Sequence, residues 1–116
     1  MDIQRQGTTA RYSDIVVHNS IAYIVEVPVS GEADAAAQTR EILDSVESLL
    51  ALAGSDRTRI LSATIYLTDM ADYDAMNAVW EAWIPTGAAP SRACVQVSAL
   101  AHAGWRVEIA LTAATI

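Results

Sequence analysis

The stretches Pro90-Ser91-Arg92-Ala93-Cys94-Val95-Gln96-Val97 and Trp105-Arg106-Val107-Glu108-Ile109-Ala110-Leu111, near the end of this sequence, carry the pattern that decides its fold. Residues two apart on a β-strand point to the same face of a sheet. Arg92 and Cys94 therefore share one face of the first predicted strand. In the second, three branched apolar residues at alternate positions predict a buried face, with Glu108 pointing the other way.

The loop at 98–104 is short enough to join these two strands as an antiparallel pair. Such a pair would place the Arg92 guanidinium, the Cys94 thiol and the Glu108 carboxylate on one face of the sheet. A cluster of this kind would bind a small anion and position a water molecule.

The rest of the chain alternates between strand-like and helix-like patterns. Residues 2–6, 14–18, 21–27 and 59–67 are expected to be strands, with a turn at Asn19-Ser20. A helix is predicted from Ala33 or Asp34 to Ala53, because its apolar residues recur at helical spacing and Gly54 follows as a stop. A second helix, capped by Thr68 or Asp69, runs to about Trp83, with Tyr73, Met76 and Trp80 in its inward stripe.

This order, β-β-β-α-β-α-β-β, predicts an α+β fold in one domain over residues 1–116. The sheet is expected to be mostly antiparallel, with both helices on one face. The other face needs cover, which self-association would supply.

Composition narrows the functional classes. All seven basic residues are arginine, so no lysine is present to form a Schiff base. The net charge of −7 disfavours nucleic-acid partners. We expect no membrane association, because no apolar run is long enough to span a bilayer. A single cysteine and a start without signal-peptide features favour a cytoplasmic protein. The spacing of histidine and cysteine predicts no metal site.

The P-x-R-x-C-V run at 90–95, followed by V-E-I at 107–109, resembles the RidA/YjgF family of reactive-intermediate deaminases. The likeness extends along nearly the whole chain, through residues 10–14, 38–40, 53–55, 62–65 and 76–80. Their order and spacing are most similar to the short YoaB-like branch. The resemblance implies a homotrimer of chorismate-mutase-like fold, with pockets between subunits. It further implies cofactor-free hydrolysis of 2-imino and enamine acids to 2-keto acids and ammonia.

The resemblance also assigns roles to Arg92 and Glu108. At Arg92 it places the arginine that binds a substrate carboxylate, a role that suits a planar guanidinium. The alternative for Arg92 is a structural salt bridge, for instance to Glu108. At Glu108 the family has an acid that positions the attacking water, and the alternative is a solvent-facing strand residue.

Three other positions are candidates for contact with the ligand or for structural support. Cys94 resembles a site residue that contacts the ligand through its backbone, and a lone buried thiol is usually inert packing. Tyr12 matches an aromatic residue near the pocket mouth, or else it packs at an interface. Asn77 falls on the apolar stripe of the second helix, so we expect a buried amide that supports a loop.

The segment Ile24-Val25-Glu26-Val27-Pro28 departs from the family, whose corresponding strand carries a Ser-Gly-Gln type sequence. Larger residues there would narrow the pocket. An inward-facing Glu26 would pair with Arg92 and oppose an anionic substrate. Two alternatives to the deaminase therefore stay open. One is a non-catalytic or regulatory trimer that binds small carboxylates, and the other is a related hydrolase of a carbamate or aminoacrylate intermediate.

Overall fold

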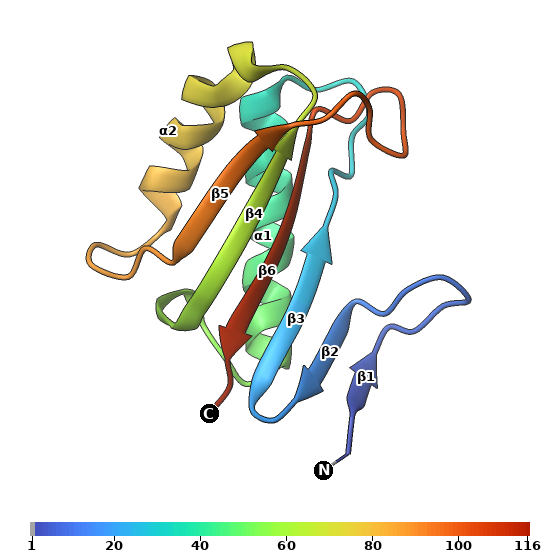
Figure 1. The fold of residues 1–116 in the computed structure, drawn as a ribbon, viewed down its shortest axis with the longest axis vertical. Helices are drawn as coiled ribbons and strands as arrows, with labels where there is room; N and C mark the ends of the chain where they lie inside the picture. The colour runs from blue at the N-terminus through green and yellow to red at the C-terminus, as the bar shows by residue number, and fades with distance from the viewer. Residues whose placement is uncertain (1) are drawn as a thin grey trace.

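The protein is described by a computed structural model covering residues 2–116, and its elements follow the predicted order (Figure 1). The strands are β1 (Gln4–Gln6), β2 (Ile15–His18), β3 (Ile21–Glu26), β4 (Ile60–Leu67), β5 (Ser91–Gln96) and β6 (Val107–Ala114). The helices are α1 (Ala35–Leu52) and α2 (Tyr73–Trp83), with single 3-10 turns η1 (Arg57–Arg59) and η2 (Met70–Asp72).

Local sequence explains where these elements begin and end. Asn19 and Ser20 both have positive φ, 52° and 63°, which is the backbone of a tight two-residue hairpin turn between β2 and β3. The Asp34 side chain caps α1 by accepting from the Ala37 amide at 2.8 Å. Gly54, at φ 76°, follows the last turn of that helix. Asp69 caps η2, so α2 starts a few residues later than predicted.

The strand order is β1-β2-β3-β6-β4-β5, which corrects the predicted pairing near the C-terminus. β5 and β6 are not neighbours, because β4 lies between them, parallel to β5 and antiparallel to β6. The reason is the long connection through α2, which forms a β-α-β crossover and lets β5 return in the same direction as β4. The other neighbouring pairs are antiparallel, so the sheet is mostly antiparallel as expected.

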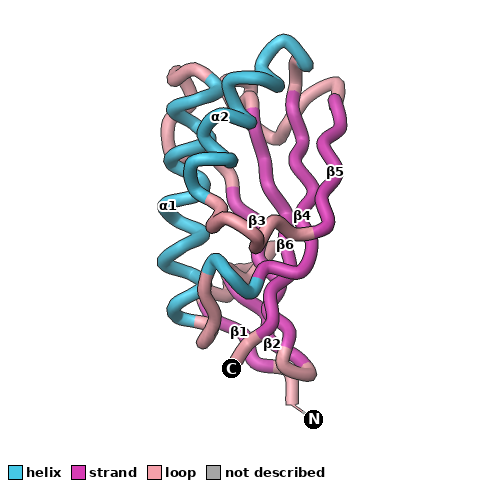
Figure 2. The backbone as a smooth tube through the Cα atoms, turned by 90° about the vertical axis from the view of Figure 1, so that its left-hand side faces the viewer, coloured by secondary structure: helices cyan, strands magenta, loops and turns pink. Residues whose placement is uncertain are grey.

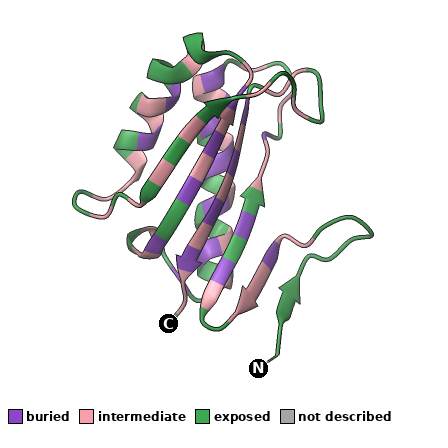
Figure 3. Cartoon of the chain, in the orientation of Figure 1, coloured by how far each residue is buried: buried purple, intermediate pink, exposed green. Residues whose placement is uncertain are grey.

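Both helices cover the same face of this sheet, as the sequence predicts (Figure 2). Burial alternates along the central strands (Figure 3), so the buried residues share one face of the sheet, the face that packs against the helices. The largest fully buried side chains include Ile24, Ile42, Leu50, Ile65, Met76 and Ile109. One expected core residue, Tyr73, is 37% exposed because it is the first residue of α2 and lies at the rim of the layer.

No helix formed by residues 2–116 lies on the opposite face of the sheet. The strand registers direct a mixture of small, hydroxyl-bearing and apolar side chains to it, among them Tyr23, Val25, Ser62, Thr64, Tyr66, Val95, Ala110 and Thr112. Within β3, β6, β4 and β5, all of which the structure describes, Glu108 is the one charged side chain on this open face. A sheet face with so little charge is suited to burial against another protein surface. None of the helices in residues 2–116 is long and apolar enough to span a membrane.

Candidate functional site

Arg92 lies on the helix-facing side of β5, at the edge of the sheet. Its guanidinium carbon is 5.4 Å from the centre of the Trp80 ring of α2, a distance at which the ring holds a cation. It borders a depression of about 350 Å³, which we call the Arg92 pocket, lined by Tyr73, Asn77, Trp80, Glu81, Ile84, Ala89, Pro90 and Arg92. The ion pairs found within residues 2–116 belong to Arg57 and Arg106, so Arg92 has no carboxylate partner among these residues.

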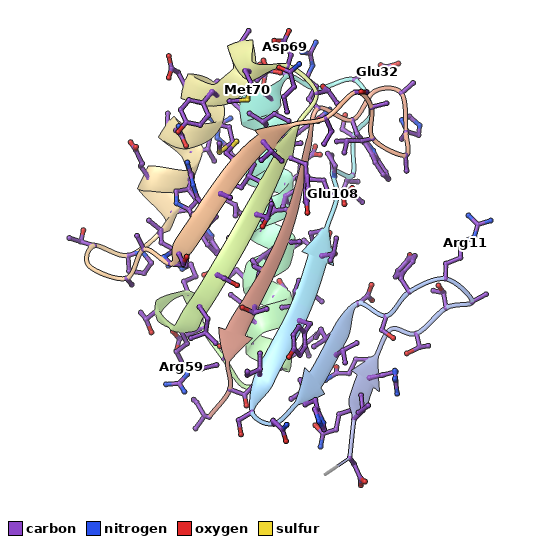
Figure 4. All side chains as sticks on the ribbon, in the orientation of Figure 1. Arg11, Glu32, Arg59, Asp69, Met70 and Glu108 are labelled. Atoms are coloured by element: carbon purple, nitrogen blue, oxygen red, sulfur yellow. The ribbon has the colours of Figure 1, made fainter. Side chains whose placement is uncertain are left out.

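Glu108 is on the other side of the sheet, which corrects the prediction of a single cluster. It lies opposite Tyr66 of β4, whereas Arg92 lies opposite Ala63 of the same strand. Two strand spacings and three residues separate their backbones by about 14 Å, and the side chains point away from one another. Figure 4 shows Glu108 on β6, beyond β4 from the edge strand. A salt bridge between Arg92 and Glu108 of one chain is therefore excluded by geometry.

Cys94 shares the helix-facing side of β5 with Arg92 and packs against the core. Burial raises the pKa of the Cys94 thiol, and the neighbouring Arg92 charge opposes this only in part. The thiol is therefore protonated at neutral pH, which makes it a poor nucleophile. This agrees with a scaffolding role for Cys94.

Glu26 does not approach Arg92, contrary to the pairing proposed from sequence. It ends β3, and both β6 and β4 separate that strand from β5. Its side chain faces α1. Burial raises the pKa of Glu26, hydrogen bonds from Ser45 and the Val27 backbone lower it in part, and the charge of Asp14 adds to the rise.

This environment predicts how Glu26 affects stability with pH. Between its ordinary pKa of 4.5 and its raised folded-state pKa, the folded chain binds more protons than the unfolded chain. Stability from this residue is therefore greatest below pH 4.5 and falls as pH rises through the folded-state pKa. We expect Glu26→Gln to raise the melting temperature at pH 7, with the gain vanishing below pH 4.5. Thermal unfolding across pH 4 to 8 measures this, with exposed Asp44→Asn as the control. An equal gain at every pH would contradict it.

Two other residues predicted from the sequence, Tyr12 and Asn77, lie in different parts of the structure. Tyr12 is 62% exposed, in the loop between β1 and β2 that carries Arg11 away from the sheet (Figure 4). Its carbonyl accepts from the Thr9 amide at 2.7 Å, which shapes that loop. Asn77 is half-buried rather than buried, and it lines the Arg92 pocket. The structure thus places Asn77 with Arg92, and it places Tyr12, Glu26 and Glu108 elsewhere.

A positioning residue that sequence reasoning did not assign is Gln38, which is fully buried in α1. Its Nε2 donates to the carbonyls of Gly104, Ala33 and Ser30 at 2.9, 3.1 and 3.3 Å, and its Oε1 accepts from the Arg106 amide at 2.7 Å. It therefore ties two loops together at the end of the sheet next to Glu108. The signal was available, because an amide at a core-facing helical position needs such partners.

We expect Gln38→Leu to lower the free energy of unfolding by on the order of 3 kcal/mol, because several buried backbone groups lose their partner. Urea denaturation measures the change. Gln4→Leu, the same substitution at an exposed position of β1, is expected to change stability by less than about 0.5 kcal/mol. Equal stability of the Gln38 variant and the wild type would show that the loops hold without it.

Known proteins resemble this chain over nearly its full length. The family model described as Endoribonuclease L-PSP matches residues 3–115. The RutC family protein YoaB of Escherichia coli K12 is 42% identical over 114 residues, which cover 98% of this chain and 99% of that protein. A crystal structure of a YjgF family member from Neisseria meningitidis superposes with a TM-score of 0.95 and 47% identity, covering 100% of this chain and 97% of the other. A RutC family protein of Haemophilus ducreyi is also 42% identical, covering 97% of this chain and 96% of that protein.

Proposed function

This chain belongs to the RidA/YjgF family, and from that premise we propose that it hydrolyses reactive 2-imino and enamine acids to 2-keto acids and ammonia. The observation that carries the proposal is the state of Arg92. Its guanidinium has no carboxylate partner within the described chain, is held against Trp80, and borders a pocket of about 350 Å³. A cation kept free in this way is suited to bind the carboxylate of a small metabolite.

We propose that the complete site forms between subunits of a homotrimer. Arg92 and Glu108 point away from each other in one chain, so a single substrate reaches both only if they come from different copies. The open face around Glu108 has no helix on it and little charge, which suits it to an interface. A cyclic trimer repeats the same heterologous contact at each interface, and each contact would unite one Arg92 with one Glu108.

The chemistry at such a site requires little from the protein. A protonated 2-imino acid reacts with water as RC(=NH2⁺)COO⁻ + H2O → RC(=O)COO⁻ + NH4⁺. Arg92 would hold the carboxylate, and Glu108 would orient the water and accept a proton as the C–O bond forms. Glu108 would then return this proton to the amine nitrogen, and ammonia would leave as the C–N bond breaks and take up the hydroxyl proton to give NH4⁺. The proposal requires no metal or organic cofactor, because a protonated imine is already electrophilic.

The direct test is to generate 2-iminobutyrate from threonine with a dehydratase and to follow the release of 2-ketobutyrate. We expect the protein to accelerate release above spontaneous hydrolysis, and to sediment as a trimer. Imino acids made by an amino-acid oxidase extend the test to other side chains. No acceleration with any of them would refute the deaminase proposal.

One observation favours a second candidate, a trimer that binds small carboxylates without turnover. Val25 lies on the open face of β3, within the segment where the family has a Ser-Gly-Gln type sequence. Its bulk would narrow an inter-subunit pocket. Binding of 2-ketobutyrate without acceleration of imine hydrolysis would favour this candidate.

We do not propose RNA cleavage, despite the name of the family model, because the net charge of −7 opposes RNA binding.

A further inference from the structure

The Arg92 pocket contains a second charged residue, of opposite sign. Glu81 of α2 and Arg92 of β5 both line it, yet among residues 2–116 they form no ion pair with one another. Glu81 is exposed and Arg92 is half-buried. The same pocket is lined by the amide-bearing Asn77 and by the apolar residues Ile84 and Pro90. The pocket therefore offers a cation, an anion and an apolar surface to one small molecule.

The position of Glu81 within its helix is also unfavourable for the stability of that helix. It lies in the last turn of α2, where the helix dipole is negative and an acidic side chain is disfavoured. Asp74, in contrast, lies in the first turn, where a negative charge is favoured. Glu81 thus adds negative charge where it does not stabilise the helix. It lines the same pocket as Arg92, with which it forms no ion pair.

We propose that the Arg92 pocket recognises zwitterions, with Arg92 binding the carboxylate and Glu81 binding the cationic nitrogen. The nitrogen is that of a protonated imine or an ammonium group on the carbon next to the carboxylate. This inference rests on the proposed role of Arg92 as the carboxylate ligand. It adds that Glu81 determines specificity, and that aliphatic side chains of the ligand lie against Ile84 and Pro90.

A consequence for turnover is that the pocket distinguishes substrate from product. A protonated 2-imino acid carries the cationic nitrogen, whereas the 2-keto acid carries a neutral carbonyl in its place. Glu81 would attract the first and not the second, so the product would dissociate more readily. Because Glu81 is solvent-exposed, the preference is expected to be about two- to fivefold in affinity.

Three stable ligands that share one carbon skeleton test this binding preference, because none of them undergoes the hydrolysis reaction. We would titrate the protein with 2-aminobutyrate, butyrate and 2-ketobutyrate by NMR. Wild type is expected to bind 2-aminobutyrate about two- to fivefold more tightly than butyrate or 2-ketobutyrate. Glu81→Gln should remove this preference while leaving the affinity for butyrate unchanged or slightly higher. Asp44→Asn, which makes the same change in net charge on an exposed position of α1, should keep the preference.

The outcomes separate this inference from the proposed function. Equal binding of all three ligands by wild type, or a preference that survives Glu81→Gln, would overturn the role of Glu81 and leave the deaminase proposal standing. A Glu81-dependent preference without imine hydrolysis would support zwitterion binding and refute the deaminase. Butyrate binding that survives Arg92→Ala, or no binding of any ligand, would overturn this inference together with the proposed role of Arg92, and the imine-hydrolysis assay decides the deaminase proposal separately. Thermal unfolding checks the fold, and Glu81→Gln is expected to match or exceed wild type in melting temperature.

Discussion

Arg92→Ala is expected to lower kcat/KM for 2-iminobutyrate by about 100-fold, because the substrate carboxylate loses a charged, two-pronged hydrogen-bond partner. Initial rates of 2-ketobutyrate release above the spontaneous rate measure the effect. The loss should appear mainly as a higher KM, since the carboxylate is bound in both the ground state and the transition state.

Arg92→Lys is the matched control. Lysine keeps the positive charge but not the planar fork, so its activity is expected to lie between those of wild type and Arg92→Ala. Because Arg92 also packs on Trp80, each variant needs a thermal unfolding curve to show that the fold is retained. Full activity in a folded Arg92→Ala protein would remove this residue from the site.

Glu108→Gln is expected to lower kcat by about 100-fold or more while leaving the binding of butyrate nearly unchanged, because the carboxylate acts on water and not on the ligand's carboxylate. Steady-state kinetics and the NMR titration measure the two quantities separately. Glutamine has nearly the same shape, and Glu108 is only half-buried, so the fold should tolerate the change. Unchanged turnover would mean that Glu108 is simply a strand residue on the open face.

The two inactive variants together test whether the site is shared between subunits. If trimers of Arg92→Ala and Glu108→Gln are mixed at equal concentration and allowed to exchange, about a quarter of the interfaces will combine an intact Arg92 with an intact Glu108. We therefore expect about a quarter of wild-type activity to return. Mixtures that stay inactive after verified subunit exchange would contradict a site shared between subunits.

The distinction between Arg92 and Glu108 shows where sequence reasoning succeeded. Alternation along each strand was read correctly, because Arg92 and Cys94 share a face of β5 and the apolar residues of β6 face the core. Two expectations were wrong: that these consecutive strands are neighbours, and that Arg92 and Cys94 share the face of Glu108, since they lie on the side of β5 that faces the core. The position of β4 between β5 and β6 depends on the crossover through α2, and no residue within either strand encodes that position.

Long-range contacts account for the other differences. Glu26 was recognised as unusual from its sequence, but its distance from Arg92 depends on the order of strands across the whole sheet. Asn77 was expected to support a loop, and it lines the Arg92 pocket instead because α2 packs beside β5. The sequence did not indicate a role for Glu81, since exposed acidic residues near helix ends are common. Its position is informative only because Glu81 and Arg92 line the same pocket.

Local patterns in the sequence predict the family, the order of helices and strands, and the core-facing side of β6, but not the core-facing side of β5. These follow from local periodicity, caps, turns and short motifs, which depend on residues close together in the chain. Packing in three dimensions sets which strands are neighbours, that Arg92 and Glu108 face away from each other, and which residues surround each of them. Those features depend on packing between segments that are far apart in the sequence. The arrangement of lowest free energy is determined by the whole sheet and its helices, and not by any one stretch.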